Sequence, residues 1–359
     1  MIKVVIHDMK KVLLIGLVLV FALVSNANAS ANQTVAGDYE LVWNMDFTGA
    51  SLNLDAFNIE VNGDGGGNNE LQYYCEKGVS LGVEPTTGKH CLILTATKEE
   101  YSGKHCTSGR VTTKNKVFFT YGKVEARIWF PQTKDGLWPA FWMMGNNYDQ
   151  VGWPRCGELD IIELGHQNGI KAGTQNRYFN GAMHLGSKWD AVWSDAQDIT
   201  YNYSVEDGFH TISCEWTPTS VEMFVDKDIY PDAKPYFTAK LEPNDNDDYN
   251  RQLVWSRPNF VLFNLAIGGN FPGIWDINGI TALAGGSRKM YVDYLRIYQR
   301  GDTGETFQSA VPSEPIEDAT AIHTPSTKEN ARKVLRNGEI RILYNGSEYN
   351  LLGEKIIND

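Results

Sequence analysis

Short runs of alternating or β-branched residues recur along the chain between clusters of Gly, Pro and Asn, and hardly any stretch shows a helical period. Such runs are typical of β-strands, and many of them at even spacing predict a β-sandwich or jelly roll. The strand-like runs cover residues 39–43, 91–97, 123–130, 159–164, 210–216, 221–225, 259–267 and 290–298.

The acidic balance of the chain limits its partners. With 44 Asp plus Glu against 32 Lys plus Arg, the formal net charge is −12. This charge argues against a nucleic-acid partner, because phosphate binding needs basic patches. A neutral polymer remains compatible with it. The 359 residues, 42% of them hydrophobic, suffice for one large β domain or two ordinary ones.

The N-terminus has the pattern of a secretory signal peptide over residues 1–29. Lys10 and Lys11 precede an apolar stretch, residues 12–24, and Ala27-Asn28-Ala29 matches a cleavage site. The apolar stretch is shorter than the roughly 20 residues that span a bilayer. We therefore expect an exported protein with no membrane-spanning segment in the mature chain.

Export permits disulfides, and the chain has five cysteines. Because this number is odd, at least one thiol is unpaired. Cys75, Cys91 and Cys106 could supply one bridge, and the sequence does not choose which pair.

Three acids stand in an otherwise apolar run at Glu158, Asp160 and Glu163. On a regular strand Glu158 and Asp160 share a face while Glu163 falls on the other. A single β-bulge near Ile161 or Ile162 would bring all three to one face, and bulges are over-represented beside active sites. Two glutamates leaning together could then approach the carboxyl separation of about 5 to 5.5 Å that retaining glycosidases use.

Two other interpretations of these acids are an alternating solvated strand face and a Ca²⁺ site, since Ca²⁺ takes carboxylate oxygens. Their neighbours favour catalysis. Trp138 and Trp142 are four residues apart, so on a strand both face the same way. Aromatic faces stack on the C–H faces of sugar rings, although packing in a core is the commoner fate of tryptophan.

The sequence resembles the laminarinase-type endo-β-1,3(4)-glucanases of glycoside hydrolase family 16. The resemblance covers residues 39–300, and the catalytic domain is predicted over residues 30–300. It implies an all-β jelly-roll sandwich of two antiparallel sheets, concanavalin-like, with the substrate in a concave cleft. The matching blocks are residues 68–74, 121–127, 138–145, 158–163, 182–184, 209–211, 215–218, 264–273 and 292–298.

The resemblance also implies roles for the acids. Glu158 corresponds to the nucleophile, Glu163 to the general acid/base, and Asp160 to a helper that hydrogen-bonds Glu158. The assignment is consistent physically, because two neighbouring carboxylates raise the pKa of Glu163 and keep it protonated. No cofactor is required for this chemistry.

Substrate-binding residues follow from the same resemblance. Trp138 and Trp142 are expected as sugar platforms, and Asn69 as a hydroxyl-binding group. Arg110 and His184 are expected on the cleft floor, with a structural hydrogen bond as the alternative for each. The last expected residue, Phe271, stands where many relatives carry Trp.

Some members of the family bind a structural Ca²⁺ on the convex side of the sandwich. The corresponding acids here are Asp46 and Asp293, with Met45 where the family carries a second acid.

The expected substrate is β-1,3-glucan, mixed-linkage β-1,3-1,4-glucan, or both, cleaved by a monomer. The spacing between Asp160 and Glu163 matches laminarinases rather than the unbulged lichenases, but agarases and carrageenases share it. A galactan hydrolase and a non-catalytic glucan-binding protein are therefore the alternatives. A sulfated galactan would call for Lys or Arg near the acids, and few stand there.

The amino-acid composition of the sequence changes after residue 300. Residues 301–330 are rich in Thr, Ser, Pro and Glu and are predicted to be a linker. Residues 339–344 form a strand pattern between two Asn-Gly pairs, which predicts a small β appendage. Residues 331–359 resemble a type IX secretion sorting segment of Bacteroidetes, with the remnant of a small β module as the alternative. We expect secretion to the extracellular or outer-membrane surface, or to the periplasm if the tail is not a sorting signal.

Overall fold

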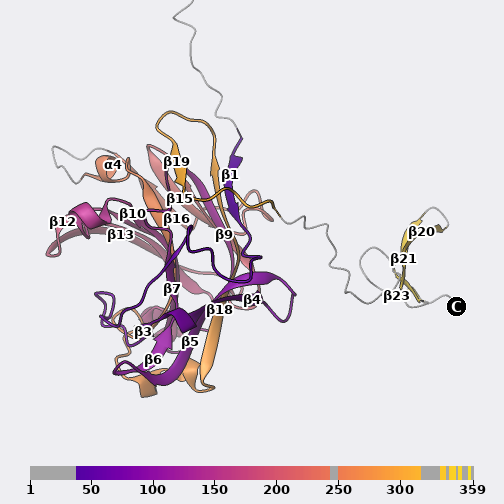
Figure 1. Cartoon of the computed structure of the whole chain (residues 1–359), viewed down its shortest axis with the longest axis horizontal. Coiled ribbons are helices and arrows are strands. Elements are labelled where there is room, and N and C mark those ends of the chain that lie inside the picture. The colour runs from indigo at the N-terminus through magenta and orange to yellow at the C-terminus, as the bar shows by residue number, and fades with distance from the viewer. Residues whose placement is uncertain are drawn as a thin grey trace, which may run out of the picture. The chain divides into compact units, whose positions relative to one another are not determined.

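The computed structural model describes residues 38–242 and 250–316, together with the backbone of four strands between residues 332 and 356. The predicted signal peptide, residues 1–29, lies outside the described residues. The chain divides into two compact units, Met1–Pro315 and Ile316–Asp359 (Figure 1). None of the helices in the described ranges is both long and apolar enough to cross a bilayer.

The first unit contains a ten-stranded and a nine-stranded sheet, and neighbouring strands pair antiparallel except for β3 and β6. This confirms the predicted sandwich of two sheets. The ten-stranded sheet has the order β16-β15-β14-β9-β18-β5-β6-β3, with β1 beside β18 and β4 beside β5. Its strands are β1 (Glu40–Met45), β3 (Tyr73–Tyr74), β4 (Val79–Val83), β5 (His90–Tyr101), β6 (Lys104–Ser108), β9 (Gly122–Trp129), β14 (His210–Trp216), β15 (Ser220–Val225), β16 (Phe237–Lys240) and β18 (Ser287–Gln299).

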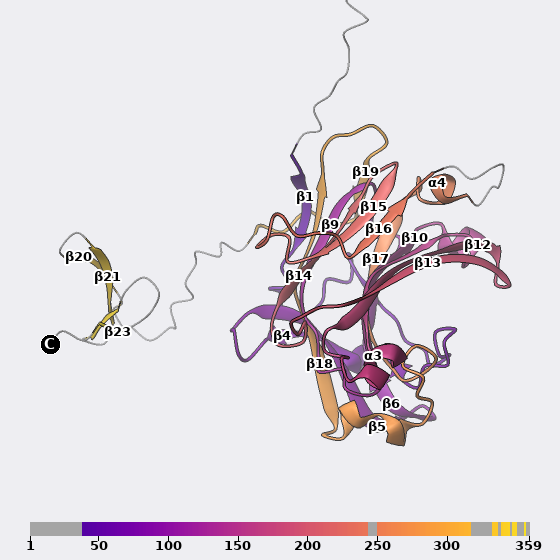
Figure 2. The same ribbon diagram turned by 180° about the vertical axis from the view of Figure 1, so that it is seen from behind.

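The nine-stranded sheet has the order β13-β12-β11-β10-β17-β7-β2, and β8 and β19 extend it beyond β17. Its long strands β12 and β13 are visibly curved (Figure 2). The strands are β2 (Asn58–Ile59), β7 (Arg110–Thr112), β8 (Val117–Thr120), β10 (Leu137–Gly145), β11 (Glu158–Leu164), β12 (Tyr178–Lys188), β13 (Ala191–Thr200), β17 (Asn259–Ile267) and β19 (Thr306–Ser309).

Helices in this unit are short. They are α2 (Tyr148–Val151), α3 (Gln167–Ala172) and α4 (Arg251–Val254), with 3₁₀ turns at Glu76–Gly78, Ile277–Gly279 and Thr281–Leu283.

The alternation of side chains along β10 separates two apolar groups. Phe141 and Met143 belong to the large core of the unit, whereas Ala140, Trp142 and Met144 belong to a second cluster with residues of β17. Every residue of β10 is buried. Residues of a strand alternate between its two faces, so the central strands of this sheet are covered on both.

All five cysteines are buried free thiols, so the bridge considered for Cys75, Cys91 and Cys106 is not formed. They behave as small hydrophobic side chains of the interior.

The predicted linker needs correction over its first half. Strand β19 pairs with β8, and the following residues return to β1. The Ser313 hydroxyl accepts a hydrogen bond from the backbone of Asn44 (3.0 Å), and the Glu314 carboxylate accepts one from the backbone of Asp46 (2.9 Å). The first unit therefore extends to Pro315. These contacts use polar and backbone groups, which leave no hydrophobic pattern in the sequence.

The second unit contains a four-stranded sheet of order β20-β21-β22-β23, which confirms the small C-terminal β appendage. Its strands are β20 (Arg332–Arg336), β21 (Glu339–Tyr344), β22 (Ser347–Tyr349) and β23 (Lys355–Ile356). The two Asn-Gly pairs stand between β20 and β21 and between β21 and β22. Residues 317–331 lie outside the described ranges.

Candidate functional site

The three acids lie on β11, and the strand contains the bulge that their spacing predicts. In the pairing with β10, Phe141 stands opposite Ile162 and Trp142 opposite Asp160, so Ile161 is the additional residue. The register with β12 also shifts between Asp160 and Glu163. Ile161 and Ile162 are both fully buried in the large core, which leaves the acids free to project from the other side.

The acids share a face with the second apolar cluster. Glu158 pairs with Met144, Asp160 with Trp142, and Glu163 with Ala140, and directly paired residues lie on the same side of a sheet. We call this side the acid face. By the same pairing it includes Asn264 of β17, Arg110 of β7 and His184 of β12.

Glu158 is held in a mixed environment. Burial and the neighbouring Asp160 raise its pKa from 4.5 to about 8, while His184, Arg110 and a hydrogen bond from Trp153 act in the opposite direction. Cations beside a carboxylate favour its ionised form. His184, Arg110 and Trp153 thus offset part of the effect that burial has on the pKa of Glu158.

Glu163 is the acid with the strongest tendency to stay protonated. Burial first, and then the charge of Asp160, raise its pKa well above 4.5. The indole nitrogen of Trp138 donates a hydrogen bond to Glu163 Oε1 at 2.9 Å and lowers the pKa in part. Two carboxyls with unequal environments can divide the roles of proton donor and ionised nucleophile.

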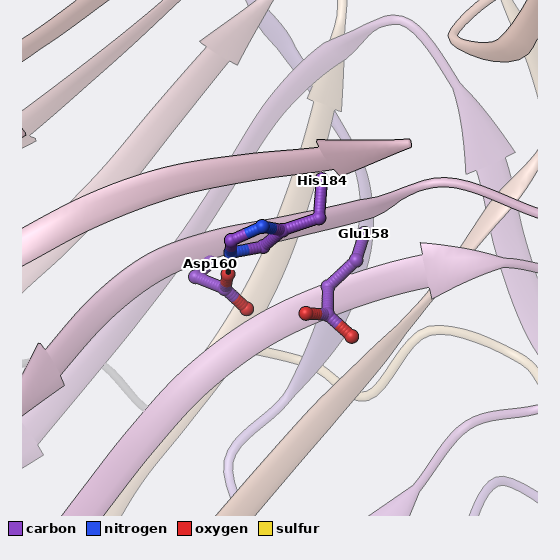
Figure 3. Close-up of side chains that lie close together, drawn as sticks. All are labelled: Glu158, Asp160 and His184. Atoms are coloured by element: carbon purple, nitrogen blue, oxygen red, sulfur yellow. Dashed lines mark ion pairs between the residues drawn. The ribbon is translucent and has the colours of Figure 1, made fainter. Parts of the chain in front are cut away.

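Asp160 lies between the two glutamates, but its close partner differs from the expected one. Its Oδ2 is 3.2 Å from His184 Nε2, and His184 Nδ1 is 2.6 Å from the Ser194 hydroxyl. Figure 3 shows Asp160 and His184 turned toward each other with Glu158 beside them. Asp160 thus positions a histidine of the next strand, and burial raises its own pKa. The predicted hydrogen bond from Asp160 to Glu158 stays a prediction.

Glu158, Asp160 and His184 also have the composition of a metal site. One ligand atom from each lies within 4.8 Å of the others. The family resemblance assigns the same carboxyls to catalysis without a metal. Measuring whether a chelator abolishes activity therefore distinguishes a metal site from a metal-free catalytic site.

The two predicted platforms are more covered than open sugar platforms would be. Trp138 is 8% exposed and stacks on Phe271, with ring centroids 4.6 Å apart. Trp142 is 9% exposed, and its indole nitrogen donates to Asn264 Oδ1 at 2.7 Å. Arg110 lies 4.9 Å from the centre of the Trp142 ring. Packing therefore fixes both rings, and little of either ring's surface is left for a ligand.

Arg110 has an internal partner that the sequence did not predict. Its side chain is 15% exposed, and its guanidinium forms an ion pair with Glu60 at 3.1 Å. The positive charge lowers the pKa of both Glu70 and Glu158. The structure thus gives Arg110 a structural ion pair and an electrostatic effect on Glu158.

Asn69 lies on the loop before β3, with a φ of 57°. Its side-chain amide donates to Asn270 Oδ1 at 3.0 Å, which also accepts from the indole nitrogen of Trp275 at 3.1 Å. The ring of Trp275 is 60% exposed. Asn270 therefore links the Asn69 side chain to the exposed ring of Trp275.

The sequence interpretation did not predict two further aromatic residues, of which Trp153 hydrogen-bonds Glu158. The rings of Trp153 and Trp189 are 4.2 Å apart, and Trp189, at the turn between β12 and β13, is 68% exposed. A β-carbon on Gly67 would lie 3.3 Å from the Trp189 ring. The only signal in the sequence was the presence of two more tryptophans, because the contacts join distant segments.

The two acids expected to hold Ca²⁺ each face an arginine. Asp293 is 2.6 Å from Arg127, and Asp46 is 3.5 Å from Arg296. A cation shared by these carboxylates would stand beside two guanidinium groups, which does not suit Ca²⁺ and its need for several oxygen ligands. The arrangement of these residues therefore does not fit the implied ion.

Comparisons with known proteins agree on one family. The model of glycosyl hydrolases family 16 matches residues 69–246. A glucan endo-1,3-β-glucosidase of Cryptopygus antarcticus is 35% identical over 248 residues, covering 66% of this chain and 83% of the relative. The clotting factor G alpha subunit of Tachypleus tridentatus is 33% identical over 270 residues, but this chain spans only 35% of it and the match covers 74% of this chain.

Among solved structures, a family 16 enzyme from the mixed-linkage glucan locus of Bacteroides ovatus, in complex with the product G4G4G3G, is similar in fold. Its TM-score is 0.62 with 35% identity, covering 72% of this chain and all of that chain (100%).

Proposed function

Because the chain belongs to glycoside hydrolase family 16, we propose that it is a secreted, endo-acting and retaining β-glucanase. Its substrate is β-1,3-glucan, mixed-linkage β-1,3-1,4-glucan, or both. The observation that carries the proposal is the bulged strand β11, which presents Glu158 and Glu163 from one face in unequal environments.

In the first step the ionised Glu158 attacks the anomeric carbon while Glu163 donates its proton to the leaving glycosidic oxygen. The C–O bond breaks, and a covalent glycosyl-enzyme forms on Glu158. In the second step Glu163, now a carboxylate, takes a proton from water as the water displaces Glu158. Two displacements at one carbon retain the configuration.

Asp160 acts as a positioning residue in this scheme. It holds His184 at 3.2 Å, and His184 lowers the pKa of both glutamates. The charge of Asp160 raises the pKa of Glu163 and so helps to keep it protonated.

The names of two relatives that are each 35% identical support a glucan rather than a galactan. The relative from Cryptopygus antarcticus is a glucan endo-1,3-β-glucosidase, and the Bacteroides ovatus enzyme holds a mixed-linkage glucan product. Arg110, a basic residue near the acids, is mostly buried and paired with Glu60. It is therefore poorly placed for the sulfate groups of a galactan.

Export is part of the proposal. The pattern of residues 1–29 and the sorting-type pattern of residues 331–359 support secretion to the cell exterior or surface. Detecting the protein in culture medium, and its loss from the medium after deletion of residues 331–359, tests this part.

Product analysis on laminarin, barley β-glucan and agarose tests the activity. We expect oligosaccharides from one or both glucans, and NMR of the earliest products should show the β-anomer. Cleavage of agarose alone would refute the glucanase, and binding without any cleavage would refute the enzyme. Activity that survives EDTA is expected, since no cofactor takes part.

Azide rescue assigns the two glutamates. With an activated aryl β-glucoside, Glu158→Ala plus azide should give the α-glycosyl azide, and Glu163→Ala plus azide the β-glycosyl azide. The reverse result would exchange the two roles. Glu206→Gln is the control, because Glu206 is also buried but hydrogen-bonds Thr133 away from the acid face.

A further inference from the structure

A surface depression lies apart from the acid face. It encloses about 650 Å³ between the end of β13, the connection to β14, and the loop that follows β15. Its lining includes Asn202, Tyr203, His210, Asp226, Tyr230 and Lys234. We call it the tyrosine pocket. His210 and Val225 belong to the ten-stranded sheet, whereas the acids belong to the nine-stranded one.

Two tyrosines give the tyrosine pocket an open aromatic surface. Tyr203 is 41% exposed and Tyr230 61%, and the neighbouring Ile229 is 62% exposed. Large apolar side chains grouped on a surface mark sites of interaction, whereas single exposed ones need no explanation. This group therefore calls for a ligand or partner.

Contacts with other aromatic rings hold the Tyr203 side chain in place. Its ring is 5.1 Å from Tyr201 and lies nearly parallel to the His210 imidazole at 6.0 Å. Tyr201 in turn packs edge-on against the buried Phe179 at 4.8 Å. A ring held in this way loses little conformational freedom when a ligand binds.

The polar groups of the pocket are also held in place. His210 Nδ1 is 2.7 Å from Asp226 Oδ2, and Asp226 Oδ1 accepts a hydrogen bond from the backbone of Thr211 at 2.9 Å. Burial and the nearby Asp226 raise the pKa of Tyr203, so its hydroxyl stays protonated and can donate or accept.

The charges of the lining favour a neutral ligand. Asp226 is negative and Lys234 is positive, so the pocket lacks the cluster of one sign that a phosphate or an acidic polymer would need. Amide, hydroxyl and imidazole groups beside aromatic rings suit a molecule with apolar C–H faces and many hydroxyls. A sugar chain has this combination.

We propose that the tyrosine pocket is a second, non-catalytic binding site for a β-glucan chain. The identity of the glucan rests on the proposed function. Tyr203 and Tyr230 stack on sugar rings, and Asn202 and Lys234 hydrogen-bond hydroxyls. The pocket holds a long chain near the enzyme while another segment is cut on the acid face. Short oligosaccharides, which cannot reach both places, gain nothing from it.

The test measures binding and hydrolysis separately in the full chain. Binding is measured by electrophoretic retardation in gels with barley β-glucan or laminarin, using Glu158→Gln to prevent cleavage. Adding Tyr203→Ala and Tyr230→Ala should weaken retardation about 10-fold. Tyr101→Ala is the matched control, because Tyr101 is 36% exposed at a different surface. Undiminished retardation of the double variant would overturn the proposal.

Hydrolysis is measured with Glu158 intact. The double Tyr variant should cleave a soluble gluco-oligosaccharide as wild type does but lose about 5- to 10-fold on an insoluble glucan. An equal loss on both substrates would overturn a separate binding site. Tyr230→Ala alone, at an exposed position, gives the same readout without risk to the fold. Failure of the proposed function looks different, since wild type would then cleave no gluco-oligosaccharide.

Discussion

The indole nitrogen of Trp138 donates a hydrogen bond to Glu163 Oε1 at 2.9 Å, from a ring that is stacked on Phe271. The residue expected from sequence as a sugar platform is thus a direct partner of Glu163, the proposed general acid. Because Trp138 lowers the pKa of Glu163, it stabilises the carboxylate that forms when the proton leaves.

Replacing Trp138 with Phe should lower kcat at least about 10-fold, since a hydrogen bond to a charged group contributes about 1.5–3 kcal/mol. The pKa of Glu163 should rise further, so the basic limb of the kcat/KM profile should move to higher pH. Trp142→Phe is the control, because its nitrogen donates to Asn264 instead. A basic limb that stays in place would contradict this role of Trp138.

The wild-type pH profile should follow the two glutamates. In the proposed mechanism, activity needs Glu158 ionised and Glu163 protonated, so it should rise through the pKa of Glu158 and fall through that of Glu163. Since burial and Asp160 raise the pKa of Glu158 from 4.5 to about 8, we expect an acidic limb well above 4.5. An acidic limb near pH 4.5 would contradict this expectation. It would show that the surroundings stabilise the ionised form of Glu158 more than burial and Asp160 destabilise it.

Asp160→Asn and His184→Gln should move the profile in opposite directions. Asp160 raises the pKa of Glu158 and Glu163 and His184 lowers both. Loss of the negative charge therefore shifts both limbs to lower pH, and loss of the histidine shifts them to higher pH. The measurement is kcat/KM against pH for each variant. Shifts in the same direction would mean that the variants act through structure rather than charge.

Tyr236→Phe should weaken the bulge. The Tyr236 hydroxyl donates to the backbone carbonyl of Ile161, the additional residue of β11. A buried carbonyl without a partner costs about 1–3 kcal/mol, so the free energy of unfolding should fall by this amount and kcat should fall with it. Denaturant unfolding and kinetics measure both. The control is Tyr121→Phe, equally buried and without a hydroxyl partner among the described residues.

Two truncations test the boundary of the first unit. A chain that ends at Pro315 keeps β19 and the contacts of Ser313 and Glu314, so its melting temperature should match that of the full chain. A chain that ends at residue 300 loses them and should melt several degrees lower. Equal melting temperatures would restore the original linker prediction.

Much of the fold could be predicted because period-2 patterns are local. The strands at residues 123–130, 159–164 and 259–267 appear in place, as β9, β11 and β17. Strand β19 was missed, since its partners are β8 and, through the following residues, β1. Trp189 and Gly67 could not be connected either, because they are far apart in sequence and meet only in the folded chain.

The sequence by itself determined the geometry of the acids. Glu158, Asp160 and Glu163 share a face because one residue between the last two is absorbed by a bulge, which follows from the alternation of side chains along a strand. Only the tertiary structure decided how the pKa values of these acids are shifted. Arg110 and His184 come to Glu158 from other strands, and Trp138 reaches Glu163 from β10. Proton affinity depends on burial and nearby charges, and these exist only after the sheets have packed.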